Sequence, residues 1–140
     1  MKTLLTGIFA ALFAIGLHAE VTYTTVPLPG SIQMDASGKS FPLVKGLAVS
    51  YPAESEPMHR NALFAQEYFG MTPQPWMKKV STPVTLALGL KAETPDAYEI
   101  SIGKNGIRIT GASASGVFYG LQTLRKSLAE EKGDTVWLPY

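Results

Sequence analysis

The sequence predicts a small α+β domain, a two-layer α/β sandwich in which helices cover one side of a β-sheet. First, about 120 of the 140 residues remain after an N-terminal leader, enough for one hydrophobic core. Second, residues 98–110 alternate apolar and polar side chains around Asn105-Gly106, which is typical of a hairpin with one buried face. Third, residues 56–69 and 113–128 carry apolar side chains at helical spacing.

The leader has the pattern of a signal peptide, residues 1–19. Lys2 precedes an apolar run from Leu4 to Leu17, and Ala19 offers a small residue for cleavage before Glu20. At 1.5 Å per residue such a run spans about 21 Å, whereas a membrane anchor must cross about 30 Å. We therefore expect a periplasmic or secreted protein with no membrane attachment after cleavage.

The composition excludes several classes of function. The chain has 12 Lys+Arg and 11 Asp+Glu, and loss of Lys2 with the leader would leave 11 of each. This balance indicates neither nucleic acid nor an anionic membrane as a partner. The absence of cysteine excludes disulfides, thiol nucleophiles and thiolate metal sites.

The first elements after the leader are predicted to be strands. Residues 32–34 and 41–44 are expected to pair as a short hairpin around Ser37-Gly38. Residues 47–51 form the next predicted strand, which ends at Pro52 because proline lacks a backbone donor.

The first predicted helix covers residues 56–69. Ser55 can cap it, Pro57 suits its first turn, and Gly70 with Pro73 should end it. Its inward side chains follow the helical period: Met58, Ala62, Ala65 and Phe69. Residues 71–80 contain repeated prolines and are predicted to be a loop, and residues 84–90 are predicted to be a buried strand.

The hairpin of residues 98–110 is the clearest local pattern. With Asn105-Gly106 as the two turn residues, paired positions sum to 211, so that Ile102 faces Ile109. The predicted dry face consists of Tyr98, Ile100, Ile102, Ile107 and Ile109, and the wet face of Glu99, Ser101, Arg108 and Thr110.

A second helix should cover the dry face of this hairpin. Ser113 or Ser115 can cap it, and Lys132-Gly133 should end it. Gly116 and Gly120 lower helix propensity, which indicates that another backbone approaches there. Its inward residues are predicted to be Val117, Leu121, Leu124 and Leu128, and its outward residues Gln122, Arg125 and Lys126.

No candidate site in the sequence has the residues of a catalytic set. His59 has no serine, cysteine or aspartate spaced as a partner and is expected to be an exposed or capping residue. The pairs Glu54/Glu56 and Glu130/Glu131 do not converge on one point and are expected to be solvated. The segments 103–106 and 111–116 lack the spacing of a phosphate-binding loop.

Two tryptophans remain as candidates for sugar stacking. Trp76 and Trp137 could each stack on a sugar ring, although a lone tryptophan in a small domain usually packs at the edge of the core. The prediction is therefore no catalytic residue, no cofactor-binding residue, no metal ligand and no cofactor in this chain.

The segments Pro95–Ile102, Asn105–Ile109 and Ala114–Leu124 resemble the non-catalytic N-terminal domain of glycoside hydrolase family 20 β-N-acetylhexosaminidases. The opening Val26-Pro27-Leu28-Pro29-Gly30-Ser31 is similar to the start of that domain. Related domains precede the barrels of other glycosidases, including α-glucuronidases and O-GlcNAc hydrolases. The resemblance implies a mostly antiparallel sheet with two helices packed on one face.

The resemblance also implies a (β/α)8 catalytic barrel after this domain, about 250 residues in a typical case. The implied boundaries are residues 20–135 for the N-terminal domain and 136–140 for the truncated start of the barrel. The Asp-Glu pair that serves substrate-assisted hydrolysis in the family has no counterpart here, because the chain contains no Asp-Glu dipeptide. Glycan substrate is therefore expected to meet this protein only through the barrel.

Two functions from different classes follow. In the first, the chain is the leading fragment of an exo-acting hexosaminidase and braces its barrel, which the apolar segment Val136–Leu138 near the end of the chain favours. In the second, it is a stand-alone carbohydrate-binding or protein-interaction module that uses Trp76 or Tyr119, or the equivalent domain of another glycosidase family. We expect the surface at residues 136–138 to be uncovered and Trp137 to be partly exposed.

Overall fold

A computed structural model describes residues 30–76, 82–128 and 135–140. In the first half, the elements are β1 (Ser40–Val44), β2 (Ala48–Pro52), α1 (Glu56–Phe69), β3 (Thr72–Trp76) and β4 (Val84–Leu88). In the second half, they are β5 (Tyr98–Gly103), β6 (Gly106–Gly111), α2 (Ala114–Ser127) and β7 (Thr135–Pro139). The predicted signal peptide lies outside the described residues.

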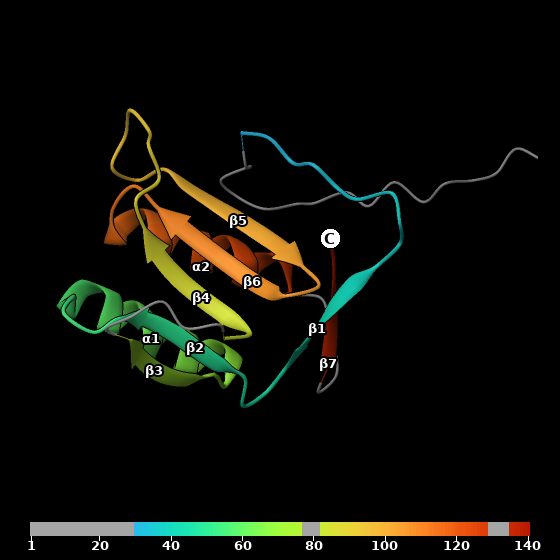
Figure 1. Ribbon diagram of the computed structural model, residues 1–140, viewed down its shortest axis with the longest axis horizontal. Helices are drawn as coiled ribbons and strands as arrows, with labels where there is room; N and C mark the ends of the chain where they lie inside the picture. Colours follow the sequence, from blue (N-terminus) through green and yellow to red (C-terminus); the bar gives the residue numbers. More distant parts are fainter. Residues whose placement is uncertain (1–29, 77–81, 129–134) are drawn as a thin grey trace, which may run out of the picture.

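The fold is a two-layer α+β sandwich, as predicted. A five-stranded sheet has the order β3-β2-β4-β6-β5, and both helices lie on the same side of it (Figure 1). A separate two-stranded sheet pairs β1 with β7. Neither helix in the described part of the chain is long and apolar enough to cross a membrane.

The strand directions differ from the mostly antiparallel sheet that was expected. Only β5–β6 and β1–β7 are antiparallel, whereas β2–β3, β2–β4 and β4–β6 are parallel. Helix α1 connects β2 to β3 as a crossover, which returns the chain in the same direction. Strand β5 lies at the sheet edge and runs opposite to β4. The chain then turns back, and β6 lies between β4 and β5, parallel to β4 and antiparallel to β5. The larger sheet is therefore mixed.

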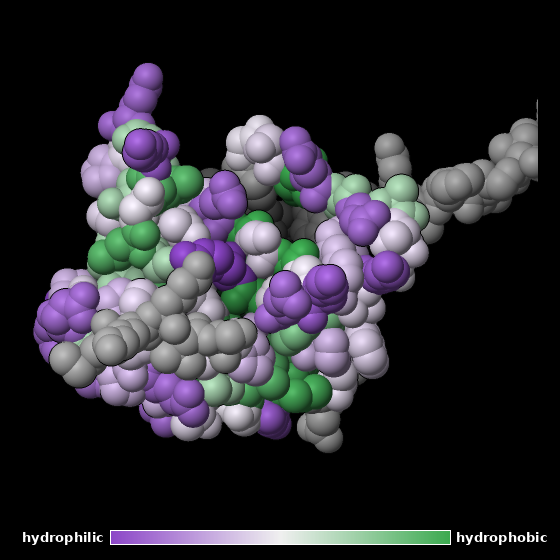
Figure 2. All heavy atoms as spheres, viewed as in Figure 1, coloured by the Kyte–Doolittle hydropathy of each residue, from purple (hydrophilic) through white to green (hydrophobic). Residues whose placement is uncertain are grey.

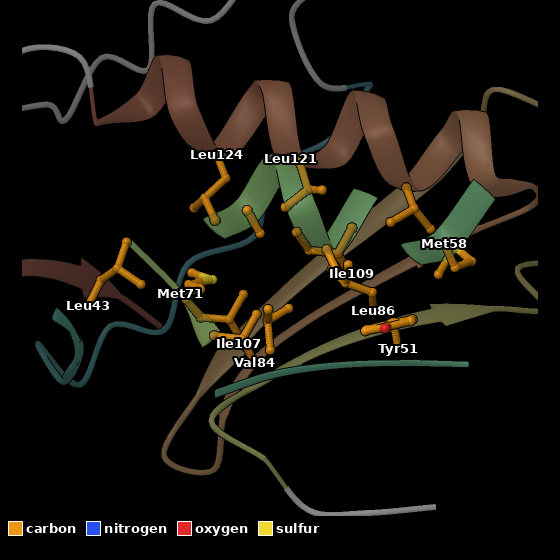
Figure 3. Packing of buried hydrophobic residues seen from close by; sticks show 14 of the residues in the cluster. Leu43, Tyr51, Met58, Met71, Val84, Leu86, Ile107, Ile109, Leu121 and Leu124 are labelled. Atoms are coloured by element: carbon orange, nitrogen blue, oxygen red, sulfur yellow. The ribbon is translucent and has the colours of Figure 1, made fainter. Parts of the chain in front are cut away.

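The hydrophobic core lies between this sheet and the helix layer. Figure 3 shows Leu121 and Leu124 pointing from α2 toward the sheet, above Ile107 and Ile109. Leu121 and Ile109 are fully buried, as the predicted phases of helix and hairpin require. The side chains that share this core are Leu43, Val49, Tyr51, Met58, Ala62, Ala65, Met71, Val84, Leu86, Ile107, Ile109, Val117, Leu121, Leu124 and Leu138.

Both helices begin where the sequence predicts. The Ser55 side chain accepts a hydrogen bond from the Met58 amide, and Gly70 ends α1 in the left-handed conformation at φ 63°. The Ser113 hydroxyl caps α2 by accepting from the amides of Ser115 and Gly116. Helix α2 ends at Ser127, before the predicted stop at Lys132-Gly133, which lies outside the described residues.

The predicted loop of residues 71–80 contains a strand, β3. The Thr72 amide donates to Leu47 O at 2.9 Å, so residues 72, 74 and 76 present their backbone groups to β2. Pro73 and Pro75 then face the open edge, where a missing N–H removes no ladder bond. The prolines are compatible with a strand because β3 lies at the sheet edge.

The predicted hairpin of residues 32–44 does not form. Strand β1 pairs with β7 instead, with Phe41 opposite Leu138. The Asp35 amide donates to Tyr140 O at 2.7 Å, which holds residue 35 against the C-terminal end rather than against β1. The partner of β1 lies almost a hundred residues away along the chain, so local pattern could not reveal it.

The hairpin β5–β6 forms with the predicted faces but with a shifted register. Ile102 pairs with Ile107 and Ile100 with Ile109, so paired positions sum to 209 rather than 211. The turn residues are Lys104 and Asn105, and Gly106 follows them at φ 119°. A side chain on Gly106 would overlap the carbonyl oxygen of Pro83. Contact with the start of β4 therefore places this glycine in the strand.

Candidate functional site

His59 lies on the surface of α1, one turn from its start. Its ring stacks on Tyr51 with centroids 5.4 Å apart and an interplanar angle of 12°. Its Nδ1 lies 3.8 Å from Glu56 Oε2, whose side chain is 74% exposed. These contacts attach the imidazole to the end of β2, and none of them supplies a nucleophile.

The other carboxylates do not form a site. Glu54 and Glu56 are both exposed, and Glu130/Glu131 lie outside the described residues. Within residues 30–76, 82–128 and 135–140, no three His, Asp or Glu side chains are close enough to hold a metal ion. The pKa of Asp35 is lowered, first by the Ser37 amide and then by the Ser37 hydroxyl, which both donate to its carboxylate in a turn.

The two tryptophans lie in different environments. Trp76 ends β3 and is half-buried, and its buried indole Nε1 has no hydrogen-bond partner among the residues that the structure describes. Trp137, in β7, is 62% exposed, as the sequence predicts. The neighbours of Trp137 are not exposed, because Leu138 belongs to the core and Val136 packs against it. The apolar surface expected at residues 136–138 is therefore reduced to Trp137.

A hollow of about 420 Å³ lies between β1 and the turn of β5–β6. It is open to solvent, and the polar side chains at its wall come from Thr82, Lys104 and Asn105. None of its lining residues is a histidine or a carboxylate, and the titratable side chain among them is Lys104. Its lining residues are Phe41, Pro42, Val44, Leu47, Thr82, Pro83, Lys104 and Asn105.

The glycines of the 111–120 segment serve packing; the predicted backbone approach is confirmed at Gly116, whereas side chains approach Gly120. A side chain on Gly116 would overlap the carbonyl oxygen of Ala97. A Cβ on Gly120 would lie 2.6 Å from Ile109 Cγ2 and 3.3 Å from Tyr98 Cδ2. Helix α2 therefore lies directly on the β5–β6 hairpin, and its backbone amides at this point are not open to a phosphate.

Sequence reasoning missed one surface feature, on the side of the helices that faces away from the sheet. Phe64 lies 4.3 Å from Tyr68 and 5.3 Å from Phe118, measured between ring centroids, and Phe118 lies 6.0 Å from Tyr119. We call this group, together with Leu63, the helix-layer patch. The i, i+4 spacing of Phe64 and Tyr68 indicated in the sequence that these two rings lie side by side on one helix. Only the packing of α1 beside α2 brings them next to the rings of Phe118 and Tyr119.

A family model described as glycosyl hydrolase family 20, domain 2, matches residues 22–137. No curated protein sequence matches the chain.

Solved structures with the same fold come from longer proteins. The N-acetyl-β-hexosaminidase of Streptomyces plicatus, solved with Thio-NAglucal, has a TM-score of 0.62 at 17% identity over 76% of this chain and 23% of its own. The β-N-acetylhexosaminidase of Bacteroides fragilis has a TM-score of 0.62 at 20% identity, over 81% and 23%. That of Streptomyces coelicolor has a TM-score of 0.58 at 19% identity, over 81% and 26%. This chain thus spans about a quarter of their length.

Proposed function

We propose that this chain, which belongs to the glycosyl hydrolase family 20 domain 2 family, is the N-terminal accessory domain of an exported β-N-acetylhexosaminidase. In this proposal, the complete enzyme removes terminal non-reducing N-acetylglucosamine or N-acetylgalactosamine from glycans. The domain braces a (β/α)8 barrel that carries the active site, and it has no catalytic residue of its own.

The observation that carries the proposal is the family match over residues 22–137. It covers nearly all of the chain after the leader, so the whole predicted domain is accounted for. The match favours family 20 over the equivalent domain of another glycosidase family. The fold likeness to three hexosaminidases, each about four times as long as the matched region, supports a domain of a longer enzyme.

The described side chains support an accessory role. His59 contacts Tyr51 and Glu56 rather than a nucleophile. The residues that line the hollow beside β1 include no histidine and no carboxylate. A glycosidase needs positioned carboxylates to protonate the leaving group and stabilise the developing charge. The proposal assigns these groups to the barrel.

The first test is the coding sequence downstream of Tyr140. We expect an uninterrupted frame that encodes a (β/α)8 barrel with an Asp-Glu pair at the end of one of its strands. A stop codon directly after Tyr140, or an unrelated domain, would contradict the proposal.

The second test compares activity with and without the downstream segment. The purified 140-residue chain should release nothing above the blank from a chromogenic N-acetylglucosaminide, whereas the protein extended through the barrel should hydrolyse it. Release by the 140-residue chain itself would overturn the assignment of catalysis to the barrel.

The exported location is part of the proposal. Mass spectrometry of protein recovered from the periplasm or the medium should show a mature N-terminus at Glu20, because cleavage is expected after Ala19. Intact residues 1–19 on a protein that stays with the cytoplasmic fraction would contradict export.

One observation favours a second candidate, a stand-alone carbohydrate-binding module. Tyr119 is 41% exposed and lies beside the ring of Phe118, an arrangement on which a sugar ring could stack. Titration with N-acetylglucosamine oligomers distinguishes the two functions. Saturable binding that Tyr119→Ala removes would favour the module, and no binding by the 140-residue chain would favour the accessory domain.

A further inference from the structure

The five-stranded sheet has one edge that its own residues block and one edge that they do not. At the β3 edge, Pro73 and Pro75 face outward, and neither offers a backbone N–H. At the other edge, β5 contains no proline and no lysine. None of the described strands pairs with the outer side of β5. Natural sheets usually block or cover such an edge, because it can pair with any extended chain.

The outer side of β5 carries a regular row of backbone groups. The Ile107 amide donates to Pro83 O at 2.8 Å, so the odd-numbered residues of β6 turn their backbone groups toward β4 and the even-numbered ones toward β5. Each even-numbered residue of β6 pairs with an odd-numbered residue of β5. The N–H and C=O groups of Tyr98, Ile100 and Ile102 therefore point away from β6, toward the sheet edge.

The apolar side chains at this edge are incompletely covered. Ile100 and Ile102 of β5 are half-buried, whereas Ile109 and Ile107, which pair with them on β6, are at most 2% exposed. All four side chains lie on the dry face of the hairpin and pack in or against the core. A further strand beside β5 would remove more of the apolar area of Ile100 and Ile102 from water.

A segment of this chain can reach the β5 edge. The described part of the chain starts at Gly30, and in Figure 1 residues 30–39 lie on the β5 side of the sheet, away from β3. Residues 22–29 span about 26 Å when extended, and the six residues of β5 span about 20 Å. Residues 21–26 consist only of valine, threonine and tyrosine, which are enriched in strands.

The prolines of this segment have the same spacing as those of β3. In Pro73-Gln74-Pro75, the prolines face outward and the residue between them bonds to the sheet. Pro27-Leu28-Pro29 repeats this pattern. Placed in the same way beside β5, its prolines face outward, and the even-numbered residues from 22 to 28 turn their backbone groups toward β5. Both edges of the enlarged sheet then end in outward-facing prolines.

We propose that residues 22–29 pair with β5 as an antiparallel edge strand, which makes the larger sheet six-stranded. Residues that bond to each other in an antiparallel pair share one face of the sheet, so Val26 and Leu28 join Ile100 on the dry face. Parallel pairing would place Val26 and Leu28 on the wet face. Figure 2 views the molecule from the wet side and shows hydrophilic side chains over β5 and β6, a surface that suits Thr25.

Amide hydrogen exchange of the 140-residue chain, followed by NMR, tests the pairing with an internal reference. The Ser101 amide faces β6 and should exchange slowly in any case. With residues 22–29 in place, the Ile100 amide should exchange within about tenfold of the Ser101 rate, whereas at an open edge it should exchange at least about a hundredfold faster. Fast exchange of Ile100 beside slow exchange of Ser101 would overturn the pairing.

Two proline variants at neighbouring threonines provide a matched control. Thr24→Pro removes an N–H that faces β5, and Thr25→Pro removes one that faces outward, as Pro27 already does. Thr24→Pro should accelerate exchange at Ile100 at least about tenfold, and Thr25→Pro should leave it unchanged. Slow exchange of Ser101 in both variants shows that the domain remains folded.

Other occupants of the β5 edge would give different results. Protection of Ile100 that survives Thr24→Pro would mean that another segment covers the edge, and protection that disappears on dilution would mean that a second copy does. Either result overturns the proposed strand, as does equal acceleration by Thr24→Pro and Thr25→Pro. The exchange measurement needs neither a barrel nor a substrate, so its failure is distinguishable from failure of the proposed function.

Discussion

Two glycines in α2 occupy their positions because of close tertiary contacts, with backbone at Gly116 and with side chains at Gly120, and not because of helix propensity. Replacing Gly116 with alanine would by itself favour the helix by about 1 kcal/mol. The added methyl would, however, overlap the carbonyl oxygen of Ala97, which is backbone and cannot rotate away. Steric overlap should dominate, so we expect Gly116→Ala to lower the free energy of unfolding in urea. Gly103→Ala is the control, since nothing lies within 4 Å of its Cβ position. Equal stability of the two variants would contradict the close approach.

Leu121 tests the phase of α2. It is fully buried above the sheet, so Leu121→Ala should leave a cavity and lower the free energy of unfolding by about 2 to 5 kcal/mol. Gln122 is the neighbouring position on the helix and lies outside the core, so Gln122→Ala should be nearly neutral. Thermal or urea unfolding of both variants provides the measurement. Similar decreases in the free energy of unfolding for the two variants would mean that α2 does not turn the Leu121 side of the helix toward the sheet.

The edge strand β3 uses its prolines to limit pairing with other chains. Pro73 and Pro75 face the open edge, so Pro73→Ala/Pro75→Ala would restore two N–H donors there. We expect little change in unfolding temperature but more light scattering on storage at high concentration. Gln74→Pro is the opposite change, because residue 74 presents its backbone to β2. The Gln74→Pro variant should unfold at a lower temperature. An unchanged unfolding temperature would contradict the pairing of β3 with β2.

The turn of β5–β6 depends on one glycine and its tertiary contact. Gly106 has φ 119° and lies against the Pro83 carbonyl, and Ile107 N donates to that same oxygen at 2.8 Å. Gly106→Ala should therefore strongly destabilise the protein, through both strain and overlap. Asn105→Ala changes a turn residue without positive φ and should have a small effect. If Asn105→Ala lowered the stability more than Gly106→Ala, the result would favour the register predicted from the sequence, with Asn105 and Gly106 as the two turn residues.

At the scale of the whole molecule, the two tryptophans report on different surfaces. Trp137 is 62% exposed, and Trp76 has a buried indole nitrogen. The variant Trp76→Phe should therefore emit at long wavelength and be quenched readily by acrylamide, whereas Trp137→Phe should emit at shorter wavelength and resist quenching. Identical quenching of both variants would contradict the exposure of β7.

The isolated chain should also self-associate at high concentration, because Leu63, Tyr68, Phe118 and Tyr119 of the helix-layer patch are exposed in the described part of the chain. Sedimentation velocity should show a concentration-dependent increase in mass that Leu63→Gln/Tyr119→Gln reduces and Leu88→Gln does not. A strictly monomeric chain at high concentration would favour the stand-alone module.

Much of the fold could be predicted from the sequence because its cause is local. The bounds of α1 follow from Ser55, Gly70 and the spacing of Met58, Ala62 and Ala65. The dry face of β5–β6 follows from alternation, which survives a register shift of two because the side-chain period is two. That no serine, cysteine or aspartate is spaced as a partner for His59 could likewise be read from the chain. The structure adds its stacking on Tyr51 and the Glu56 carboxylate 3.8 Å from its Nδ1.

Other features were decided only by contacts between residues far apart in the chain. The pairing of β1 with β7, the parallel order of β2, β4 and β6, and the position of Gly106 against Pro83 each join segments that no local pattern relates. From the sequence alone, Pro73 and Pro75 predict a loop. Only the sheet order shows that they lie in an edge strand, where proline is tolerated. The helix-layer patch exists because α1 packs beside α2, which brings Phe64 to Phe118 across fifty-four positions of sequence (118 − 64). Local propensity and period determined the elements, and tertiary packing determined which of their surfaces meet and which remain open.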